Sequence, residues 1–144
     1  MTVVVGVDGS APARAALAWA MDEARRRGTR LVAVHVVPRP WAAGAAGGPY
    51  GAFVTADMRR QLEKRGRDLL AAEVDAARAA AGGTVEVEQE LREGPPAAAL
   101  LHAAQAADLL VVGSRGHGGF ASLVLGSVAS QCAAHGRCPV AVVR

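Results

Sequence analysis

The sequence is poor in aromatic side chains and in cysteine. Phenylalanine, tryptophan and tyrosine together make up 3% of its 144 residues, and its two cysteines are Cys132 and Cys138. So few rings leave no stacking platform for nucleic acid, and no helix-turn-helix or zinc-finger signature occurs. With His135 between them, the two thiols still fall short of the four ligands of a structural zinc site. We therefore expect neither nucleic-acid binding nor a metal–thiolate centre.

Long apolar runs and the P-loop motif are also missing. No apolar run approaches the roughly 18 residues that a membrane span needs. Met1 leads directly into a strand pattern, without the basic and apolar regions of a signal peptide. The sequence Gly-x4-Gly-Lys-Ser/Thr, whose lysine holds phosphates in many NTPases, does not occur. We expect no membrane association and a cytoplasmic location.

What is present is typical of one folded domain. Hydrophobic residues make up 51% of the chain, charged residues 20%, and the formal net charge is +3. The length suits one core and not two, so we expect a single domain over residues 1–144. Basic clusters at residues 25–27 and 59–67 lie within helical patterns. Solvated helix faces explain this charge better than a nucleic-acid partner does.

Strand and helix patterns alternate along the chain. Apolar segments predict strands at residues 3–7, 31–37, 109–112 and 140–143, and a strictly alternating segment predicts one at 85–91. Helical periodicity predicts helices from about residue 13 to 28, one long helix from 55 to about 81 in which Gly66 interrupts the pattern, one from 95 onward, and one from about 127 to 135. Because alternation means that one face is wet, residues 85–91 belong at an edge. The expected fold is a doubly wound parallel sheet of order 3-2-1-4-5 with four main helices.

The stretch from Asp108 to Val128 predicts a phosphate-binding loop. A buried strand ends at Val112, and two glycines, Gly113 and Gly116, follow it. Glycine has no Cβ, so we expect these residues to adopt positive φ and to let the backbone approach an anion. Gly126 and Ser127 then open the last helix, where unpaired N–H groups favour a phosphate.

The motif Gly113-x2-Gly116-x9-Gly126-Ser127 resembles the nucleotide-binding signature of the universal stress protein family. The resemblance extends to the opening residues 3–10, the Val34-His35-Val36 strand, Gly94-Pro95 and the closing residues 138–143. It implies a Rossmann-like fold and a bound adenine nucleotide, ATP first and ADP or AMP otherwise, with Mg²⁺. The residues that it places around the ligand are Gly6, Asp8, Ser10, Val36, Val112, Gly113, Arg115, Gly116, Gly126, Ser127 and Val128.

Several of these side chains also have an ordinary structural interpretation. Asp8 suits ribose hydroxyls, an adenine amine or a nucleotide-bound metal ion, and Ser10 is equally suited to capping the first helix. Arg115 either touches phosphate or points to solvent, whereas we expect His117 to point to solvent. His35, alone in an apolar strand, is interpreted as a packing residue because no triad partner lies near it in sequence.

Two further segments carry predictions about surfaces. Residues 38–53, rich in proline and glycine, form a long connection that either covers the nucleotide with Trp41 or Tyr50 or acts as a plain tether. The last strand, Val140–Val143, is short, uncharged and at the other edge of the sheet. An uncovered apolar edge favours pairing, so we expect an antiparallel homodimer through this strand.

Three functions are compatible with these residues. A nucleotide-binding regulator of the stress response, acting as a homodimer, fits the complete glycine motif. A slow ATPase or nucleotidyl transferase would use the same loop, but a Walker lysine and an evident base are missing. The third possibility is a protein of the same fold that binds no nucleotide and acts through protein contacts. The first is the prediction; catalysis beyond weak ATP hydrolysis is not expected.

Overall fold

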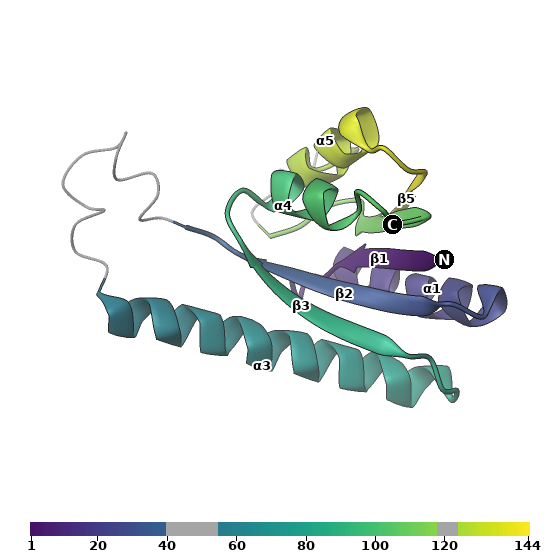
Figure 1. Cartoon of the computed structure of the whole chain (residues 1–144), viewed down its shortest axis with the longest axis horizontal. Coiled ribbons are helices and arrows are strands. Elements are labelled where there is room, and N and C mark those ends of the chain that lie inside the picture. The colour runs from purple at the N-terminus through teal and green to yellow at the C-terminus, as the bar shows by residue number, and fades with distance from the viewer. Residues whose placement is uncertain (40–54, 118–123) are drawn as a thin grey trace.

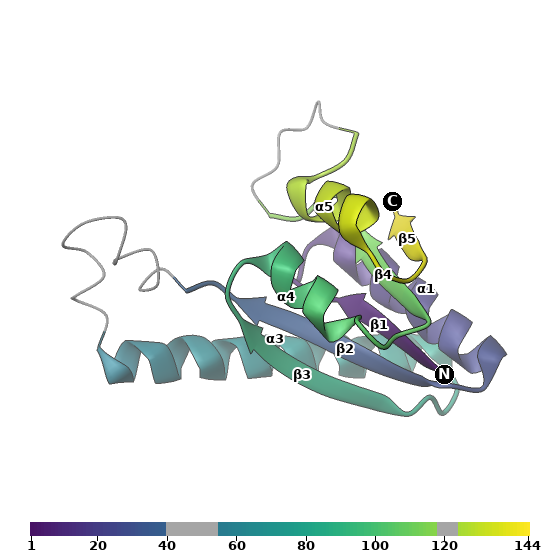
Figure 2. The ribbon, with the colours of Figure 1, turned by 45° about the horizontal axis from the view of Figure 1, so that its top comes forward.

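The computed structural model describes residues 1–39, 55–117 and 124–144, and its centre is one five-stranded sheet. The strands are β1 (Thr2–Gly6), β2 (Arg30–Val37), β3 (Val87–Glu93), β4 (Leu109–Gly113) and β5 (Val140–Val143). All neighbours run parallel, in the order β3-β2-β1-β4-β5 (Figure 2). The strand order and the class of fold predicted from the sequence are confirmed.

Helices cover both faces of this sheet. They are α1 (Ala11–Arg27), α3 (Ala56–Ala81), α4 (Pro96–Ala103) and α5 (Ser127–His135). Helices α1 and α3 lie on one face, and α4 and α5 lie on the other (Figure 1). In the part of the chain that the structure describes, no helix is long and apolar enough to cross a membrane.

Each face of the sheet has its own apolar core. Val3 and Val5 point to the core under α1 and α3, whereas Val4 points to the core under α4 and α5. Alternate residues of a strand face opposite sides, so a central strand covered on both faces must be apolar throughout. The same division applies to β4, where Leu110 and Val112 face α4 and α5.

The two long helices begin and end at residues suited to those positions. Ser10 caps α1 by accepting a hydrogen bond from the backbone N–H of Ala13 at 3.3 Å. Gly28 then ends α1 with φ of 61°. Helix α3 follows the same plan, with Thr55 as N-cap and Gly82 in the left-handed conformation.

One prediction about these elements is confirmed and one is wrong in detail. The long helix predicted from residue 55 to about 81 is α3, which continues through Gly66 because this glycine is buried against β2 and β3 and packing there offsets its low helix propensity. The edge strand spans Val87–Glu93 and not residues 85–91, because its register pairs Leu31 with Val87 and Val37 with Glu93. Backbone pairing thus continues two residues beyond the alternating pattern.

Candidate functional site

A cleft of about 490 Å³ opens at the carboxyl ends of β1, β2 and β4. Ligands of open α/β sheets bind in this position, where the chain leaves neighbouring strands in opposite directions. Every residue that the sequence analysis placed around a nucleotide lines the cleft, with the exception of Ser10. The lining residues among them are Gly6, Asp8, Val36, Val112, Gly113, Arg115, Gly116, Gly126, Ser127 and Val128.

On the β1 side, Asp8 organises the turn that leads into α1. One carboxylate oxygen of Asp8 accepts hydrogen bonds from the backbone N–H of Ser10 at 2.9 Å and from its hydroxyl at 2.5 Å. The Ser10 hydroxyl oxygen in turn accepts from Ala13 and caps the helix, and Ser10 is 8% exposed. Ser10 is therefore a capping residue behind the cleft wall, while Asp8 itself faces the cleft.

On the β4 side, glycines allow close contacts between backbone segments. A Cβ at Gly113 would lie 2.7 Å from the carbonyl carbon of Pro12, and a Cβ at Gly116 would lie 2.7 Å from Oδ2 of Asp8. Neither of these two glycines has positive φ, nor does Gly126, whose φ is −71°. The expectation of left-handed backbone is wrong here. Backbone atoms of Pro12 and Ala13 occupy the space of a Cβ at Gly113, and the end of the Asp8 side chain occupies it at Gly116.

Gly126 brings the chain back to the loop after β4. Its N–H donates to the carbonyl of Ser114 at 2.7 Å, and a Cβ on Gly126 would lie 3.2 Å from Cα of Arg115. Helix α5 then begins at Ser127 with no side-chain cap from Gly126. The first turn of α5, residues 127–129, lines the cleft, so its amide donors lie at the edge of an open space.

The opposite wall of the cleft is apolar. Val34, Val36 and Pro38 line it from β2 and the residues after it, and Pro96 and Leu100 line it from α4. Leu100 also lies over Gly6, where a Cβ would stand 3.0 Å from its Cδ1 atom. The cleft thus combines an apolar wall with a polar wall of backbone amides, a combination typical of nucleotide sites.

Pro96 and Leu100 were missed as cleft residues in the sequence. The helical spacing of Leu100 predicts a packing residue, and it gives no sign that the side chain also lines a cleft. The signal that could have identified them is the position of Gly94-Pro95 directly after the edge strand, which starts α4 at the same end of the sheet as the glycine loop. The predicted covering role of Trp41 and Tyr50 concerns residues outside those that the structure describes.

Two histidines contact the turn after β1. His35 makes a 2.7 Å hydrogen bond from Nδ1 to the carbonyl oxygen of Val7, which agrees with its interpretation as a packing residue. His117 makes a 2.7 Å hydrogen bond from Nε2 to the carbonyl oxygen of Asp8. The expectation that His117 points to solvent is therefore wrong, although its side chain is exposed. Arg115 lines the cleft beside it.

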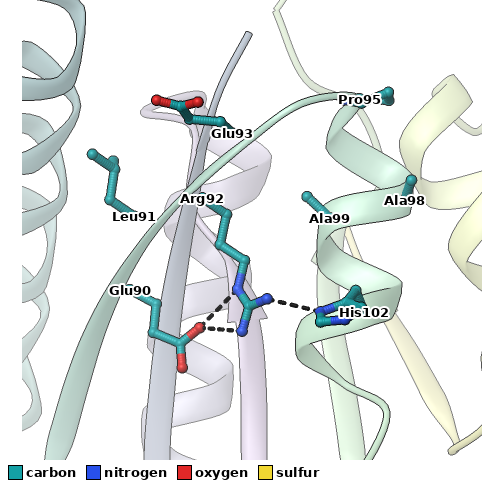
Figure 3. A pocket seen from close by; sticks show the side chains of 8 residues that line it. All are labelled: Glu90, Leu91, Arg92, Glu93, Pro95, Ala98, Ala99 and His102. Carbon is teal, nitrogen blue, oxygen red and sulfur yellow. Dashed lines mark hydrogen bonds and ion pairs between the residues drawn. The ribbon is translucent and has the colours of Figure 1, made fainter. Parts of the chain in front are cut away.

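A second hollow, of about 600 Å³, lies between β3 and α4 (Figure 3). Its polar side chains already bond to one another. Arg92 donates to Glu90 at 2.9 Å and to Nδ1 of His102 at 2.9 Å, which joins β3 to α4. Its remaining lining is mostly small and apolar, as at Ala98 and Ala99. The first cleft is the better candidate because its walls offer backbone amides at an uncapped helix start.

The thiols and acidic groups of the described residues do not form a metal centre. Burial raises the pKa of the Cys132 thiol to about 11, which keeps it protonated and unreactive at neutral pH. Both cysteines are free, Cys132 fully buried and Cys138 partly so. Within residues 1–39, 55–117 and 124–144, no group of three or more His, Cys, Asp or Glu side chains is placed to hold a metal ion.

Fold and cleft together define a Rossmann-like α/β protein with a glycine loop at the switch point of its sheet. The model of the universal stress protein family matches residues 1–144. A universal stress protein of Thermus aquaticus is 37% identical over 146 residues, covering 99% of this chain and 98% of the relative. The chain therefore belongs to the universal stress protein family.

Relatives of different length match equally well. A universal stress protein of Mycobacterium tuberculosis is 36% identical over 147 residues, which cover 99% of this chain but 48% of the relative. The chain thus spans about half the length of that relative. Among solved structures, a universal stress protein in complex with cAMP has a TM-score of 0.70 and 28% identity, covering 100% of this chain and 97% of the other.

Proposed function

We propose that the chain binds an adenine nucleotide in the cleft at the ends of β1 and β4, with ATP and Mg²⁺ as the first choice. The observation that carries this proposal is the start of α5. It opens into the cleft without a side-chain cap, next to Gly113, where backbone atoms occupy the space of a Cβ, and Gly116, where the Asp8 carboxylate occupies it. Free amide donors at a helix start favour an anion such as phosphate.

We assign different parts of the nucleotide to the two walls of the cleft. The adenine is assigned to the apolar wall, where Val36 offers backbone groups at the end of β2. The phosphates are assigned to the segment from Gly113 to Gly116 and to the first turn of α5, with Arg115 at the rim. The cAMP-bound universal stress protein, similar in fold and 28% identical, supports an adenine nucleotide as the ligand class.

We assign Oδ2 of Asp8 to the ligand. Among the described residues, the hydrogen bonds that the Asp8 carboxylate accepts go to Oδ1, from the N–H and the hydroxyl of Ser10, whereas Oδ2 lies against Gly116. A carboxylate oxygen in this place suits ribose hydroxyls or a Mg²⁺ ion carried by the phosphates. The residues present therefore fit a metal–nucleotide complex with Mg²⁺ bound mainly by phosphate oxygens.

Titration calorimetry of nucleotide-free protein tests the proposal. ATP, ADP, AMP and cAMP are compared, each with and without magnesium, and the mixture is analysed for hydrolysis products. Micromolar affinity without turnover supports a binding protein. Fast turnover would instead favour the enzyme, and absence of binding to all four would favour a protein that acts through protein contacts alone.

The Gly126→Val variant provides the matched test of the phosphate position. A valine side chain would meet the backbone of Arg115 and Ser114 at the start of α5. We expect binding to be lost while the far-UV circular dichroism stays native. Retained affinity would contradict the assignment of the phosphates to this loop.

We also propose a homodimer through β5. The backbone of β5 bonds to β4 through alternate residues, since Pro139 and Val143 accept from Leu110 and Ser114. The peptide groups of Val140 and Val142 therefore point away from β4, toward the open edge of the sheet. Side chains of β5 carry no charge that would oppose a second strand, which supports pairing with a second copy of the chain.

The biological role that follows is regulation of the stress response by nucleotide occupancy. A deletion strain complemented with the wild type or with Gly126→Val would test it: the proposal requires that only the wild type restores survival under stress. The cytoplasm stays the location predicted from the sequence, and fractionation of the host cell would test that.

A further inference from the structure

Two backbone carbonyls at the end of β1 are held by histidine rings from different segments. Val7 is bonded by His35 of β2, and Asp8 is bonded by His117 of the loop after β4, each at 2.7 Å. A carbonyl oxygen only accepts hydrogen bonds, so His35 carries a proton on Nδ1 and His117 carries one on Nε2. The turn after β1 is thereby tied to a strand and to the glycine loop.

The contact of His117 is part of a larger connection between the two walls. A Cβ at Gly9, where φ is 80°, would lie 3.8 Å from Nε2 of His117, so the ring lies close along this turn. One residue before His117, Gly116 packs against Oδ2 of Asp8. Residues 8–9 and 116–117 therefore meet through a carboxylate, a carbonyl and an imidazole.

The other described end of the same loop is fixed independently. Gly126 donates to the carbonyl of Ser114 at 2.7 Å, which holds the start of α5 against the end of β4. The segment 114–117 is thus attached to α5 by this bond and to β5 by the N–H of Ser114, which donates to the carbonyl of Val143 at 2.7 Å. Its contacts with the turn after β1 include the hydrogen bond of His117 and the packing of Gly116 against Asp8.

We infer that His117 is a positioning residue of the proposed nucleotide site. By donating its Nε2 proton to the carbonyl of Asp8, it fixes the distance between the wall that carries Asp8 and the wall that carries Arg115, Gly116 and the start of α5. The inference rests on the proposed function. It assigns His117 no contact with the ligand; its effect on affinity comes from the geometry that it maintains.

Calorimetry with cAMP compares the wild type with three variants. His117→Ala removes the donor, and we expect affinity about five- to tenfold weaker, the usual worth of one such hydrogen bond. His117→Gln keeps an amide N–H near the position of Nε2, and we expect it to restore most of the affinity. His135→Ala, at the exposed end of α5, is the control and leaves affinity unchanged.

A second measurement needs no ligand. Backbone order parameters from ¹⁵N relaxation report motion of residues 115–117 in the empty protein. We expect them to fall in His117→Ala, to recover in His117→Gln, and to stay unchanged in His135→Ala. Thermal unfolding of all four proteins verifies that the variants fold.

Each alternative outcome overturns a different statement. If His117→Ala binds cAMP as the wild type does, or its order parameters do not change, the positioning role is wrong and the proposed function stands. If His117→Ala and His117→Gln weaken cAMP binding equally, while His117→Gln restores the order parameters of residues 115–117, His117 contacts the ligand directly and the positioning role is wrong. If the wild type binds none of the adenine nucleotides, the proposed function fails, and the positioning role fails with it.

Discussion

Gly66 of α3 lies directly against His35 of β2. A Cβ at position 66 would stand 3.1 Å from Cδ2 of that histidine, 3.0 Å from Val37 and 2.8 Å from Leu91. The glycine therefore lets a long helix approach the sheet at the place where His35 reaches the turn after β1. Glycine at position 66 permits this close packing. Its backbone conformation is the ordinary helical one of α3, so conformational freedom is not the reason for glycine here.

Replacing this glycine by alanine should destabilise the protein. Alanine favours a helix by about 1 kcal/mol over glycine, but an added methyl group in a filled core costs about 1–3 kcal/mol. We expect Gly66→Ala to lower the free energy of unfolding by about 1 kcal/mol net, measured in urea. Gly83→Ala is the control, since its Cβ would come no closer than 3.5 Å to another side chain. Equal stability of the two variants would contradict this account.

The loop glycines should separate stability from binding. In Gly113→Ala the new Cβ meets the backbone of Pro12 and Ala13, which cannot rotate away, and we expect a loss of about 3 kcal/mol in unfolding free energy. In Gly116→Ala it meets only the carboxylate of Asp8, so we expect a loss of about 1 kcal/mol but much weaker nucleotide binding. Denaturant unfolding and calorimetry on both proteins check this. The opposite order of stabilities would refute it.

Acid should weaken the junction between β3 and the start of α3. The hydrogen bond from Arg39, helped by the charge of Arg59, holds the pKa of Glu93 below its ordinary value. A carboxyl group with a lowered folded pKa stabilises the protein above its unfolded pKa of about 4.3, and that contribution is lost as pH falls further. We expect Glu93→Gln to lose less stability than the wild type between about pH 5 and pH 3. Thermal unfolding of both proteins over this pH range provides the measurement. An equal loss of stability in Glu93→Gln and the wild type would contradict this prediction.

The proposed dimer should respond to proline at one position of β5 and not at its neighbour. The N–H of Val142 points to the open edge, so Val142→Pro should abolish dimers while the monomer stays folded. Ala141 faces β4 instead, so Ala141→Pro should lower stability by removing a bond within the sheet. Sedimentation and thermal unfolding distinguish the two. A dimeric Val142→Pro protein would exclude pairing through this strand.

The order of the strands could be predicted because its signals are local. Alternation in the third strand predicts a sheet edge, and the strand order that satisfies it places the first and fourth strands side by side. That order predicts that Asp8 faces Gly113, whereas in the structure Gly116, three residues further along, lies against Asp8. Such inferences need only the period of a pattern and the chain order of the elements.

Contacts between distant segments could not be predicted. The sequence shows three loop glycines but not the neighbouring atoms that occupy the space of a side chain. Sequence reasoning therefore predicts a left-handed backbone at these glycines, whereas the structure shows close contacts with other segments. Gly66 interrupts the helical pattern of the sequence, and its packing against Leu91 and His35 has no local signal because these residues come from other parts of the chain. The hydrogen bond of His117 has no sequence signal for the same reason: its partner is the carbonyl of Asp8, 109 positions away.

The two edges of the sheet are chemically unlike, and this limits how far the sheet can grow. The outer strand β3 carries Glu88, Glu90, Arg92 and Glu93, whereas β5 has only valine and alanine. A strand that pairs with its own copy uses up that edge in both molecules at once. Both outward edges of the resulting ten-stranded sheet would then be the charged ones, which resist further strands. In the proposed dimer, association through β5 would therefore end at two molecules and would not continue into a fibre.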